Sequence, residues 1–303
     1  MLAVLAHRTP TFSDPFSGIQ MWFPIDLHCH STASDGGHSP SQLVQLAHQN
    51  GLKYLALTDH DTCAGLGEAR EAAAEQGVEL INGIELSSIW ANCGIHVVGL
   101  GMDPDHPSMQ QAQAQQKQAR IKRSEQIDQA LQQRGMTGVL ERARQFGATD
   151  ALGRPHFAQA MVQLGYVDTE VEAFNRYLGS GKEGDIRCHW PSLATVIGWI
   201  KESGGVAVLA HPLKYDLNWR RLRLMLNDFV AAGGGAIEVS YGGENPHRII
   251  DLVRIAREHG LKMSVGSDFH RSEFHWSRLG KYPPIKGDFD PVWQEWGIEL
   301  EAG

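Results

Sequence analysis

Short apolar runs recur along the chain, and each has the pattern of a buried β-strand. They lie at 25–27, 54–58, 78–84, 95–100, 206–210, 236–240 and 262–266. Segments whose apolar residues recur at helical spacing lie between most of them, at 39–50, 64–76, 192–202, 219–232 and 246–259. Because strands that alternate with helices pair in parallel, the pattern predicts an α/β fold built on a parallel sheet.

The alternation of strands and helices breaks after Gly101-Met102-Asp103-Pro104. Residues 107–134 are polar and rich in Gln and Arg, yet their Met, Ile and Leu residues keep helical spacing. Three further helices are predicted, with little strand signal, at 138–147, 155–164 and 169–179. We therefore predict a helical insertion over residues 103–190.

The segments on either side of this insertion, 23–102 and 191–296, are predicted to form one barrel domain whose mouth the insertion caps. A chain of 303 residues is long enough for such an arrangement. Residues 1–22 contain only a short apolar run, too short for a secretory signal, and are predicted to be a disordered extension. Met21 is therefore a candidate for the true start.

Composition and charge narrow the class of protein. Apolar residues make up 42% of the chain, and no apolar stretch reaches the length of about 18 residues that a membrane span needs. The net charge of −8 argues against binding to long nucleic acid, which usually requires a basic surface. The four cysteines lack CxxC spacing, so we expect reduced thiols in a cytoplasmic protein. No obligate protein partner is indicated, and a monomer is expected.

Residue types that bind metals stand at the ends of the apolar runs. His28 and His30 follow the first run at a spacing of two, so they project to one side of the strand and Cys29 to the other. Because the carboxyl ends of parallel strands meet at one end of a barrel, we expect such side chains to converge on a catalytic site. The complete set is His28, His30, Asp35, His60, Glu85, His96, His211, Asp268 and His270.

Six imidazoles and three carboxylates are more than one ion can use, since a metal ion takes about four to six ligands. We therefore expect two or three divalent ions that share bridging carboxylates. The set contains no thiolate, which argues against a closed structural zinc site. Manganese is the first choice for such ligands, with iron or zinc as alternatives. One histidine of this kind is more often a hydrogen-bonded core residue, so the prediction depends on the recurrence.

The helical insertion contains candidates for a phosphate site. Gly153-Arg154-Pro155-His156 opens a helix, where free backbone N–H groups favour anions. Ser180-Gly181-Lys182 is a short turn with a lysine, and two arginines lie one turn apart on the long helix, where a solvated face is the alternative explanation. The candidate phosphate-binding residues are therefore Arg154, His156, Lys182, Arg120 and Arg123.

The metal-binding residues fall into motifs with a characteristic order. These are HxH, TDHD, GxE, IHVVG, AHP and SDFH. In this order they resemble the PHP (polymerase and histidinol phosphatase) superfamily of metal-dependent phosphoesterases, from about Pro24 to Trp296. The resemblance implies a distorted (β/α)7 barrel with a trinuclear centre, and all nine ligand positions carry the expected residue types. It extends to a subgroup of 3′,5′-nucleoside bisphosphate phosphatases and 5′→3′ exoribonucleases.

The resemblance also implies a reaction, the hydrolysis of a phosphate ester by metal-bound hydroxide. In the subgroup an Arg-x-His and a Gly-Lys segment border the site, which implies that Arg154, His156 and Lys182 bind a 5′-phosphate. The phosphate on the 3′ side would then lie at the metals. If that phosphate is terminal, the activity is a bisphosphate phosphatase; if it links to another nucleotide, the activity is a 5′→3′ exoribonuclease. The expected substrate is a nucleotide or a short 5′-phosphorylated oligonucleotide.

Other functions remain open from the sequence. A histidinol-phosphate-type phosphomonoesterase would not need a second phosphate site, a polymerase-associated exonuclease normally belongs to a much longer chain, and a non-catalytic module would have lost ligands. Two acids that flank His60 are either partners that orient imidazoles or turn formers. Four aromatic residues are candidates for base stacking, although packing is the commoner role. These residues are Asp59 and Asp61, and Trp90, Trp190, Tyr215 and Tyr241.

Overall fold

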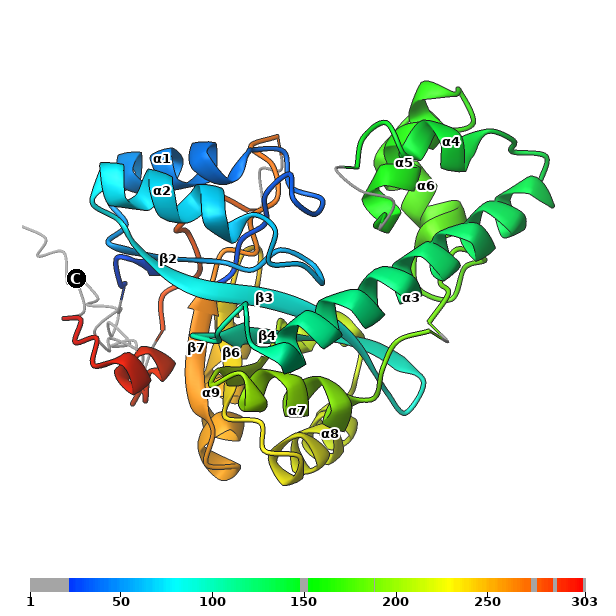
Figure 1. Cartoon of the computed structure of the whole chain (residues 1–303). Coiled ribbons are helices and arrows are strands. Elements are labelled where there is room, and N and C mark those ends of the chain that lie inside the picture. The colour runs from blue at the N-terminus through cyan, green and yellow to red at the C-terminus, as the bar shows by residue number, and fades with distance from the viewer. Residues whose placement is uncertain (1–21, 148–151, 188, 274–276, 286–287, 302–303) are drawn as a thin grey trace, which may run out of the picture.

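The computed structural model describes residues 22–147, 152–187, 189–273, 277–285 and 288–301. The extension predicted at 1–22 therefore lies, apart from Trp22, outside the described residues. Among the described residues, seven strands form one sheet in the order of the sequence (Figure 1). They are β1 (Ile25–Asp26), β2 (Tyr54–Leu57), β3 (Glu79–Trp90), β4 (Cys93–Leu100), β5 (Val206–Leu209), β6 (Ala236–Tyr241) and β7 (Lys262–Gly266).

The first and last strands approach each other, so the sheet is nearly closed into a barrel. Leu27 N donates to Val265 O at 3.2 Å, and His30 N donates to Phe269 O at 2.9 Å just beyond the two strands. Cys29 and Phe269 form a parallel bridge at the same place. The sheet therefore brings the residues that follow β1 and β7 side by side, and the predicted distorted barrel is confirmed.

One strand runs against the predicted direction. Of the six pairings between neighbouring strands, four are parallel, and the two that involve β4 are antiparallel. The connection from β3 to β4 is the short turn Ala91–Asn92, where both residues have positive φ, and a turn this short can join only antiparallel strands. The prediction of a parallel sheet was therefore wrong at β4. Because β4 is reversed, His96 near its beginning pairs with Ser87 of β3, close to the mouth.

Helices cover the outside of the barrel. In Figure 1, α1 and α2 lie above the strands and α7, α8 and α9 below them. The start predicted for the first helix is confirmed, because Ser39 caps it and forms a reciprocal capping box with Gln42. The helices are α1 (Pro40–Gln49), α2 (Leu66–Gln76), α7 (Leu193–Glu202), α8 (Trp219–Ala231) and α9 (Pro246–Glu258), with short 3₁₀ turns η2 (Pro212–Tyr215) and η3 (Val292–Trp296).

The segment between β4 and α7 is helical, as the sequence predicts. It contains α3 (Pro107–Gln132), α4 (Val139–Ala143), α5 (Arg154–Gln163), α6 (Glu170–Ala173) and the π-helix η1 (Phe174–Leu178). Twenty-six residues make α3 roughly 40 Å long, and Figure 1 shows it running from the barrel to α4, α5 and α6. Met109 and Ala112 of α3 join the main hydrophobic core, whereas Ile127 and Leu131 join a second core formed with α4–α6 and η1. One rigid helix thus connects two buried cores.

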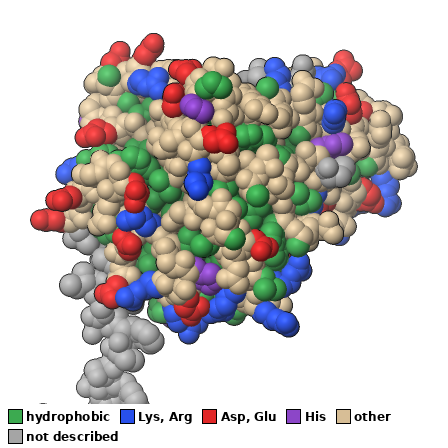
Figure 2. Space-filling view, turned by 60° about the horizontal axis from the view of Figure 1, so that its bottom comes forward, with side chains coloured by type: hydrophobic (Ala, Val, Ile, Leu, Met, Phe, Trp, Pro, Cys, Tyr) green, Lys and Arg blue, Asp and Glu red, His purple; other side chains and the backbone are tan. Residues whose placement is uncertain are grey.

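Charged side chains are mixed on the surface that faces the viewer in Figure 2. Acidic and basic groups alternate around patches of apolar atoms, and this face carries no continuous basic area. Long nucleic acid usually requires a continuous basic area, which this face does not present.

Candidate metal and phosphate site

A cavity of about 630 Å³ lies where the barrel meets the helical segment. Its lining includes Asp35, His60 and Asp268 from the barrel and Arg123 and Arg154 from the helical segment. The cavity is thus bordered by candidate metal ligands on one part of its wall and by arginines on another.

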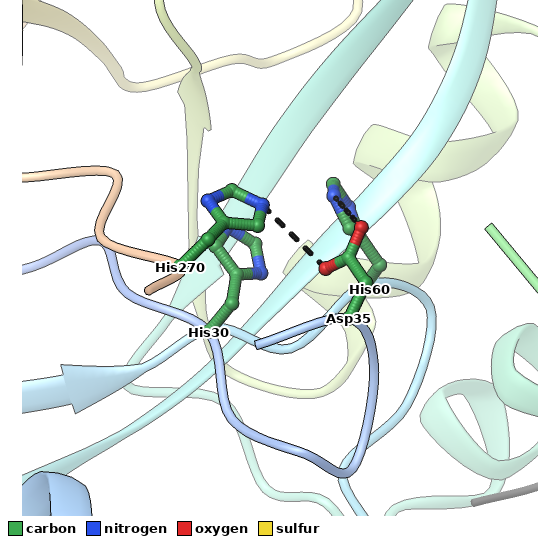
Figure 3. A group of neighbouring side chains, drawn as sticks. All are labelled: His30, Asp35, His60 and His270. Carbon is green, nitrogen blue, oxygen red and sulfur yellow. Dashed lines mark ion pairs between the residues drawn. The ribbon is translucent and has the colours of Figure 1, made fainter. Parts of the chain in front are cut away.

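The nine residues predicted as metal ligands converge beside this cavity. Their nitrogen and oxygen atoms form four overlapping groups, in each of which the potential ligand atoms lie within 4.8 Å of one another. Figure 3 shows one of these groups, in which the carboxylate of Asp35 points at the imidazoles of His60 and His270. The four groups of potential metal ligands are His30, Asp35, His60 and His270; His28, Glu85 and His211; His28, His30 and Asp268; and His60, Glu85 and His96.

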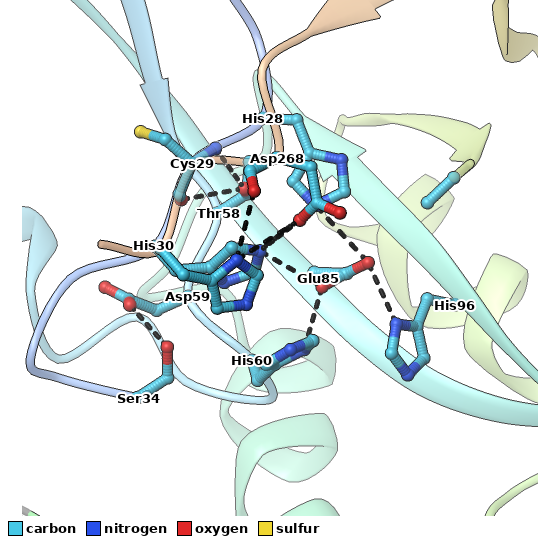
Figure 4. Close-up of polar contacts among 12 residues, drawn as sticks. His28, Cys29, His30, Ser34, Thr58, Asp59, His60, Glu85, His96 and Asp268 are labelled. Atoms are coloured by element: carbon cyan, nitrogen blue, oxygen red, sulfur yellow. Dashed lines mark hydrogen bonds and ion pairs between the residues drawn. The ribbon is translucent and has the colours of Figure 1, made fainter. Parts of the chain in front are cut away.

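Glu85 lies at the centre of this cluster. It is fully buried in β3, and Figure 4 shows it between imidazoles that come from separate strand ends. The nearest distances to its carboxylate are 2.7 Å from His60 Nδ1, 2.9 Å from His211 Nε2, 3.0 Å from His96 Nδ1, 3.3 Å from His28 Nε2 and 3.4 Å from His30 Nε2. A carboxylate in this position can bridge more than one ion.

Two turns at the strand ends hold unusual backbone angles. His211, directly after β5, has φ of 27°, and Asp268, after β7, has φ of 50°. Residues other than glycine adopt positive φ only where the surrounding structure enforces it, and such residues gather at functional sites. The backbone strain is therefore located at two candidate ligands that follow the ends of their strands.

Electrostatic interactions divide the imidazoles by protonation. Burial, together with His270 and His60, lowers the pKa of His30 to about 3. Burial also opposes the charged form of His60, but the carboxylates of Glu85 and Asp35 raise its pKa to about 9. Because a metal binds the neutral imidazole, His30 is already in the ligand form at neutral pH, whereas His60 must release a proton.

Asp59 anchors the loop that carries Asp35. Its carboxylate accepts hydrogen bonds from Ser31 N at 2.7 Å, from Ser31 Oγ at 2.6 Å and from Ser34 Oγ at 2.6 Å (Figure 4). Of the two roles that the sequence left open, the structure places Asp59 in loop anchoring rather than against an imidazole. The loop is further restricted at Gly36, where an added Cβ would lie 2.2 Å from the carbonyl oxygen of His30.

Asp61 joins the barrel to α3. Its carboxylate accepts from Ser87 N at 2.6 Å, from Ser87 Oγ at 2.8 Å and from Arg120 Nε at 2.6 Å. Gln116, one turn earlier on α3, donates to the carbonyl oxygen of Ser87 at 2.6 Å. These contacts fix α3 against β3 and direct Arg120 into the cavity.

Cationic side chains line the cavity on the side of the helical segment and at its border with the barrel. Arg154 donates to Leu178 O at 3.0 Å and lies 3.6 Å from Asp185. The guanidinium groups of Arg120 and Arg123 lie over the ring of Trp190, at 5.6 and 5.3 Å from its centre. The cationic residues of the lining are Arg120, Arg123, Arg154, Arg187, Lys214 and Arg271.

Two of the predicted phosphate residues do not line the cavity. His156 is buried, and its Nδ1 accepts from Gly153 N at 2.9 Å, so it holds the turn that carries Arg154. Lys182 is exposed, while Ser180 of the same turn reaches the lining. The structure therefore brings Arg120, Arg123 and Arg154 together but leaves Lys182 outside.

Comparisons with known proteins agree with these motifs. A family model described as the PHP domain matches residues 26–143. A 5′-3′ exoribonuclease of Haemophilus influenzae is 42% identical over 270 residues, which cover 89% of this chain and 98% of that protein. The chain belongs to the PHP family. A 3′,5′-nucleoside bisphosphate phosphatase of Chromobacterium violaceum is a PHP relative that is 36% identical over 272 residues, 89% of this chain and 95% of the relative.

A solved structure extends the likeness to the whole fold. A Chromobacterium violaceum protein, described as an amidohydrolase with bound sulfate and no metal, superimposes with a TM-score of 0.85 at 35% identity. The match covers 92% of this chain and 98% of that one. This PHP protein is thus a hydrolase that acts on phosphate esters, as predicted. Within the described residues, no helix is both long and apolar enough to cross a membrane.

Sequence reasoning missed four charged residues of the PHP site. Lys214 forms an ion pair with Asp268, and Arg271 directly follows the last histidine motif. Glu238 contacts His28 from β6. Its signal was a single carboxylate inside an otherwise apolar strand, Ala236-Ile237-Glu238-Val239. The fourth residue is Arg187, which lines the cavity from the loop before α7.

The aromatic candidates for base stacking separate into two pairs. Trp190 and Tyr215 line the cavity. Trp90 is outside the lining and donates to Asp228 at 2.7 Å, while Tyr241 is 1% exposed and donates to Glu244 at 2.6 Å. Base stacking therefore remains a prediction for the first pair only.

Proposed function

We propose that this PHP enzyme hydrolyses the phosphate on the 3′ side of 5′-phosphorylated nucleotides at a centre of three divalent metal ions. It would act as a 3′,5′-nucleoside bisphosphate phosphatase, as a 5′→3′ exoribonuclease on short RNA, or as both. One observation carries the proposal: a single cavity of about 630 Å³ takes candidate metal ligands from the barrel and arginines from the helical segment.

Some buried polar atoms of the cluster lack partners in the described part of the chain, and metal ions would supply them. Nδ1 of His30 and Nδ1 of His211 are buried and have no hydrogen-bond partner among the described residues. Native proteins rarely leave such atoms unpaired. Moreover, the Nε2 atoms of His28 and His30 face each other at 3.2 Å, which places two potential lone pairs on one point. A bound cation would satisfy these atoms together.

The number of groups supports more than one ion. Four overlapping groups share Glu85, His28, His30 and His60, so neighbouring ions would use common ligands. Imidazole and carboxylate donors are compatible with manganese, and with iron or zinc as alternatives. When bound, such ions lower the pKa of a coordinated water and withdraw charge from the phosphate.

The arginines supply the second half of substrate recognition. A guanidinium group offers a planar fork of donors that matches phosphate oxygens. Arg120, Arg123 and Arg154 present three such forks to one cavity, and Arg187 extends the set. Asp185 pairs with Arg187 and lies near Arg154, so it orders these side chains before a substrate arrives. A nucleotide with a 5′-phosphate at the arginines would direct its 3′ side toward the candidate metal ligands.

The names of the relatives support the same substrate class. One is named as an exoribonuclease and another as a bisphosphate phosphatase. The structural neighbour is described with bound sulfate, a tetrahedral dianion of the same shape as phosphate. Both activities would need one 5′-phosphate site and one hydrolytic site, and they differ only in whether the 3′ phosphate continues into a chain.

A substrate comparison tests the proposal. The Mn²⁺-loaded enzyme would be given adenosine 3′,5′-bisphosphate, AMP, adenosine 3′-monophosphate and a short 5′-phosphorylated RNA, with the products separated by chromatography. We expect inorganic phosphate and AMP from the bisphosphate, 5′-mononucleotides from the RNA, and no turnover of AMP. Equal turnover of both monophosphates and the bisphosphate would instead indicate a small-metabolite phosphomonoesterase, such as a histidinol-phosphate-type enzyme, and would overturn the proposal.

Variants separate the two ends of the cavity. Arg154→Ala should raise KM for the bisphosphate by about tenfold or more, since a charged hydrogen bond contributes about 1.5–3 kcal/mol, but leave KM for adenosine 3′-monophosphate nearly unchanged. Arg134→Ala is the matched control, because Arg134 is exposed and lies outside the lining. His28→Ala should abolish turnover of every substrate, whereas His48→Ala on the exposed face of α1 should not.

A further inference from the structure

Glu238 is a buried carboxylate that belongs to none of the four groups of candidate ligands. It lies on β6 and is 2% exposed. Oε1 and Oε2 lie 3.1 and 3.3 Å from His28 Nδ1, and Oε2 also accepts from the backbone N–H of His211 at 2.7 Å. One carboxylate thus contacts two elements that carry candidate metal ligands.

The contact with Nδ1 determines which nitrogen of His28 is free. A carboxylate accepts hydrogen bonds, so a neutral His28 ring keeps its proton on Nδ1 and its lone pair on Nε2, which is the form that binds a metal. That Nε2 lies 3.2 Å from His30 Nε2, 3.3 Å from Glu85 and 3.5 Å from Asp268. The free lone pair is therefore directed at the centre of the candidate ligand cluster.

The second contact acts on the backbone. His211 has φ of 27°, an angle that an ordinary residue does not adopt without support. The hydrogen bond from its N–H to Glu238 supplies part of that support. Its Nε2 then lies 2.9 Å from Glu85.

The surrounding strands leave room for this arrangement. A Cβ at Gly266 of β7 would lie 2.3 Å from His28 Cβ and 3.0 Å from Glu238 Oε1, so glycine is required there. The pairing of β6 with β7 also shifts by one residue between Glu238 and Ser240, a bulge of the kind that re-aims side chains beside active sites. An isolated buried carboxylate is costly, and these features are explained together if its position serves the ligands.

We propose that Glu238 is a positioning residue of the metal centre: it fixes the tautomer and ring orientation of His28 and holds His211 in its strained turn, without itself binding an ion. This inference rests on the proposed function, since it presupposes that metal binds at the cluster. A carboxylate behind a ligating imidazole typically raises metal affinity by about 10–100-fold.

Glutamine is the informative replacement at this position. It has the shape of glutamate, but an NH₂ donor replaces one of the two acceptor oxygens, so either His28 Nδ1, 3.1 Å from Oε1, or His211 N, 2.7 Å from Oε2, would face a donor. If the amide nitrogen faces His28, the ring must expose a lone pair on Nδ1 and carry its proton on Nε2, where the metal would bind. Glu238→Asp keeps the carboxylate one methylene further away and should recover part of the function. Glu258→Gln, at an exposed carboxylate on α9, controls for the loss of one charge.

The experiment measures Mn²⁺ binding to the chelator-treated full chain by calorimetry and by electron paramagnetic resonance of free Mn²⁺. We expect Glu238→Gln to lower the affinity for at least one Mn²⁺ ion by about 10–100-fold. The affinity of Glu238→Asp should lie between that of Glu238→Gln and that of the wild type, and Glu258→Gln should bind Mn²⁺ as the wild type does. Nitrogen-15 chemical shifts of His28 should show the proton on Nδ1 in the wild type loaded with diamagnetic Zn²⁺, which needs no variant to fold.

The outcomes separate the two proposals. If the wild type binds no Mn²⁺, the proposed metal-dependent function fails first. If it binds Mn²⁺ but a folded Glu238→Gln variant binds with equal affinity, or if the His28 proton lies on Nε2 in the wild type, the positioning role of Glu238 is overturned while the metal centre stands. A lower affinity accompanied by equal thermal stability of the metal-free proteins would show that the effect concerns the ligands rather than the fold.

Discussion

Arg120 and Asp61 form a buried ion pair between the helical segment and the barrel, and breaking it should destabilise the protein. Arg120 Nε donates to Asp61 Oδ2 at 2.6 Å, and the two side chains are only 7% and 1% exposed. Arg120→Met keeps much of the apolar length but removes the charge. The carboxylate of Asp61 would then remain buried without its cation.

The magnitude follows from what Asp61 retains. Removing one partner of a buried pair costs about 3–5 kcal/mol. Asp61 would keep its hydrogen bonds from Ser87 N at 2.6 Å and Ser87 Oγ at 2.8 Å, and Arg120 borders a cavity that can admit water. We therefore expect a loss at or below the lower end, about 2–3 kcal/mol. In the double variant Arg120→Met/Asp61→Asn no charge is left unpaired, so its loss should be only about 1 kcal/mol.

Urea denaturation of the metal-free protein measures these free energies of unfolding. Both single variants and the double variant would be compared at one pH, with the dependence on urea checked for a common slope. We expect the double variant to be more stable than either single variant, with a coupling energy above about 2 kcal/mol. If the losses of the two single variants instead sum to the loss of the double variant within about 0.5 kcal/mol, the two residues are independent and the reasoning is refuted.

Three further predictions concern the ligand cluster. Gly266→Ala should lower stability by about 1–3 kcal/mol and weaken Mn²⁺ binding in calorimetry, because its Cβ would lie 2.3 Å from His28 Cβ; Gly198→Ala, where nothing lies within 4 Å, should do neither. When free Mn²⁺ is held at 100 times its dissociation constant, removing it should lower the free energy of unfolding by about 2.7 kcal/mol. Equal melting temperatures with and without EDTA would contradict binding to the folded state. Since the pKa of His60 is raised to about 9, the stability that its charge contributes to the metal-free protein is complete below about pH 6.5 and lost as the pH rises through 9. The advantage of the wild type over His60→Gln in urea should therefore shrink over that range, and a constant advantage would disprove the assignment.

The convergence of the nine polar residues could be predicted because the signal is local. Most motifs are an apolar run followed by a histidine or an acid, and His96 stands near the beginning of its run. The geometry of a sheet that closes on itself brings such ends together. The reversed direction of β4 also had a local signal. About ten residues separate the apolar runs at 78–84 and 95–100, whereas a parallel crossover needs about a dozen or more.

Contacts between distant parts of the chain had no such signal. Glu238 and His28 are 210 positions apart, and no spacing rule connects a carboxylate on one strand with the ring nitrogen that it faces. Asp59 stands next to His60, which suggested an imidazole partner, yet its carboxylate turns to Ser31. In the segment before α7, Lys182 was favoured because it is charged and because the resembling subgroup has a Gly-Lys segment there. Which side of an irregular turn faces a cavity depends on packing, and there Arg187 is in the lining.

The distance between the two ends of the cavity is determined by a helix rather than by a loop. The first part of α3 packs into the barrel core through Met109, and its last part packs into the second core through Ile127. Arg120 and Arg123 lie between these anchors, and the bond from Arg120 to Asp61 fixes the helix within reach of the candidate metal ligands. A helix held at both ends cannot adapt its position as a mobile loop can. The cavity should therefore discriminate between substrates by the separation of their two phosphates, and this discrimination should persist when the base is changed.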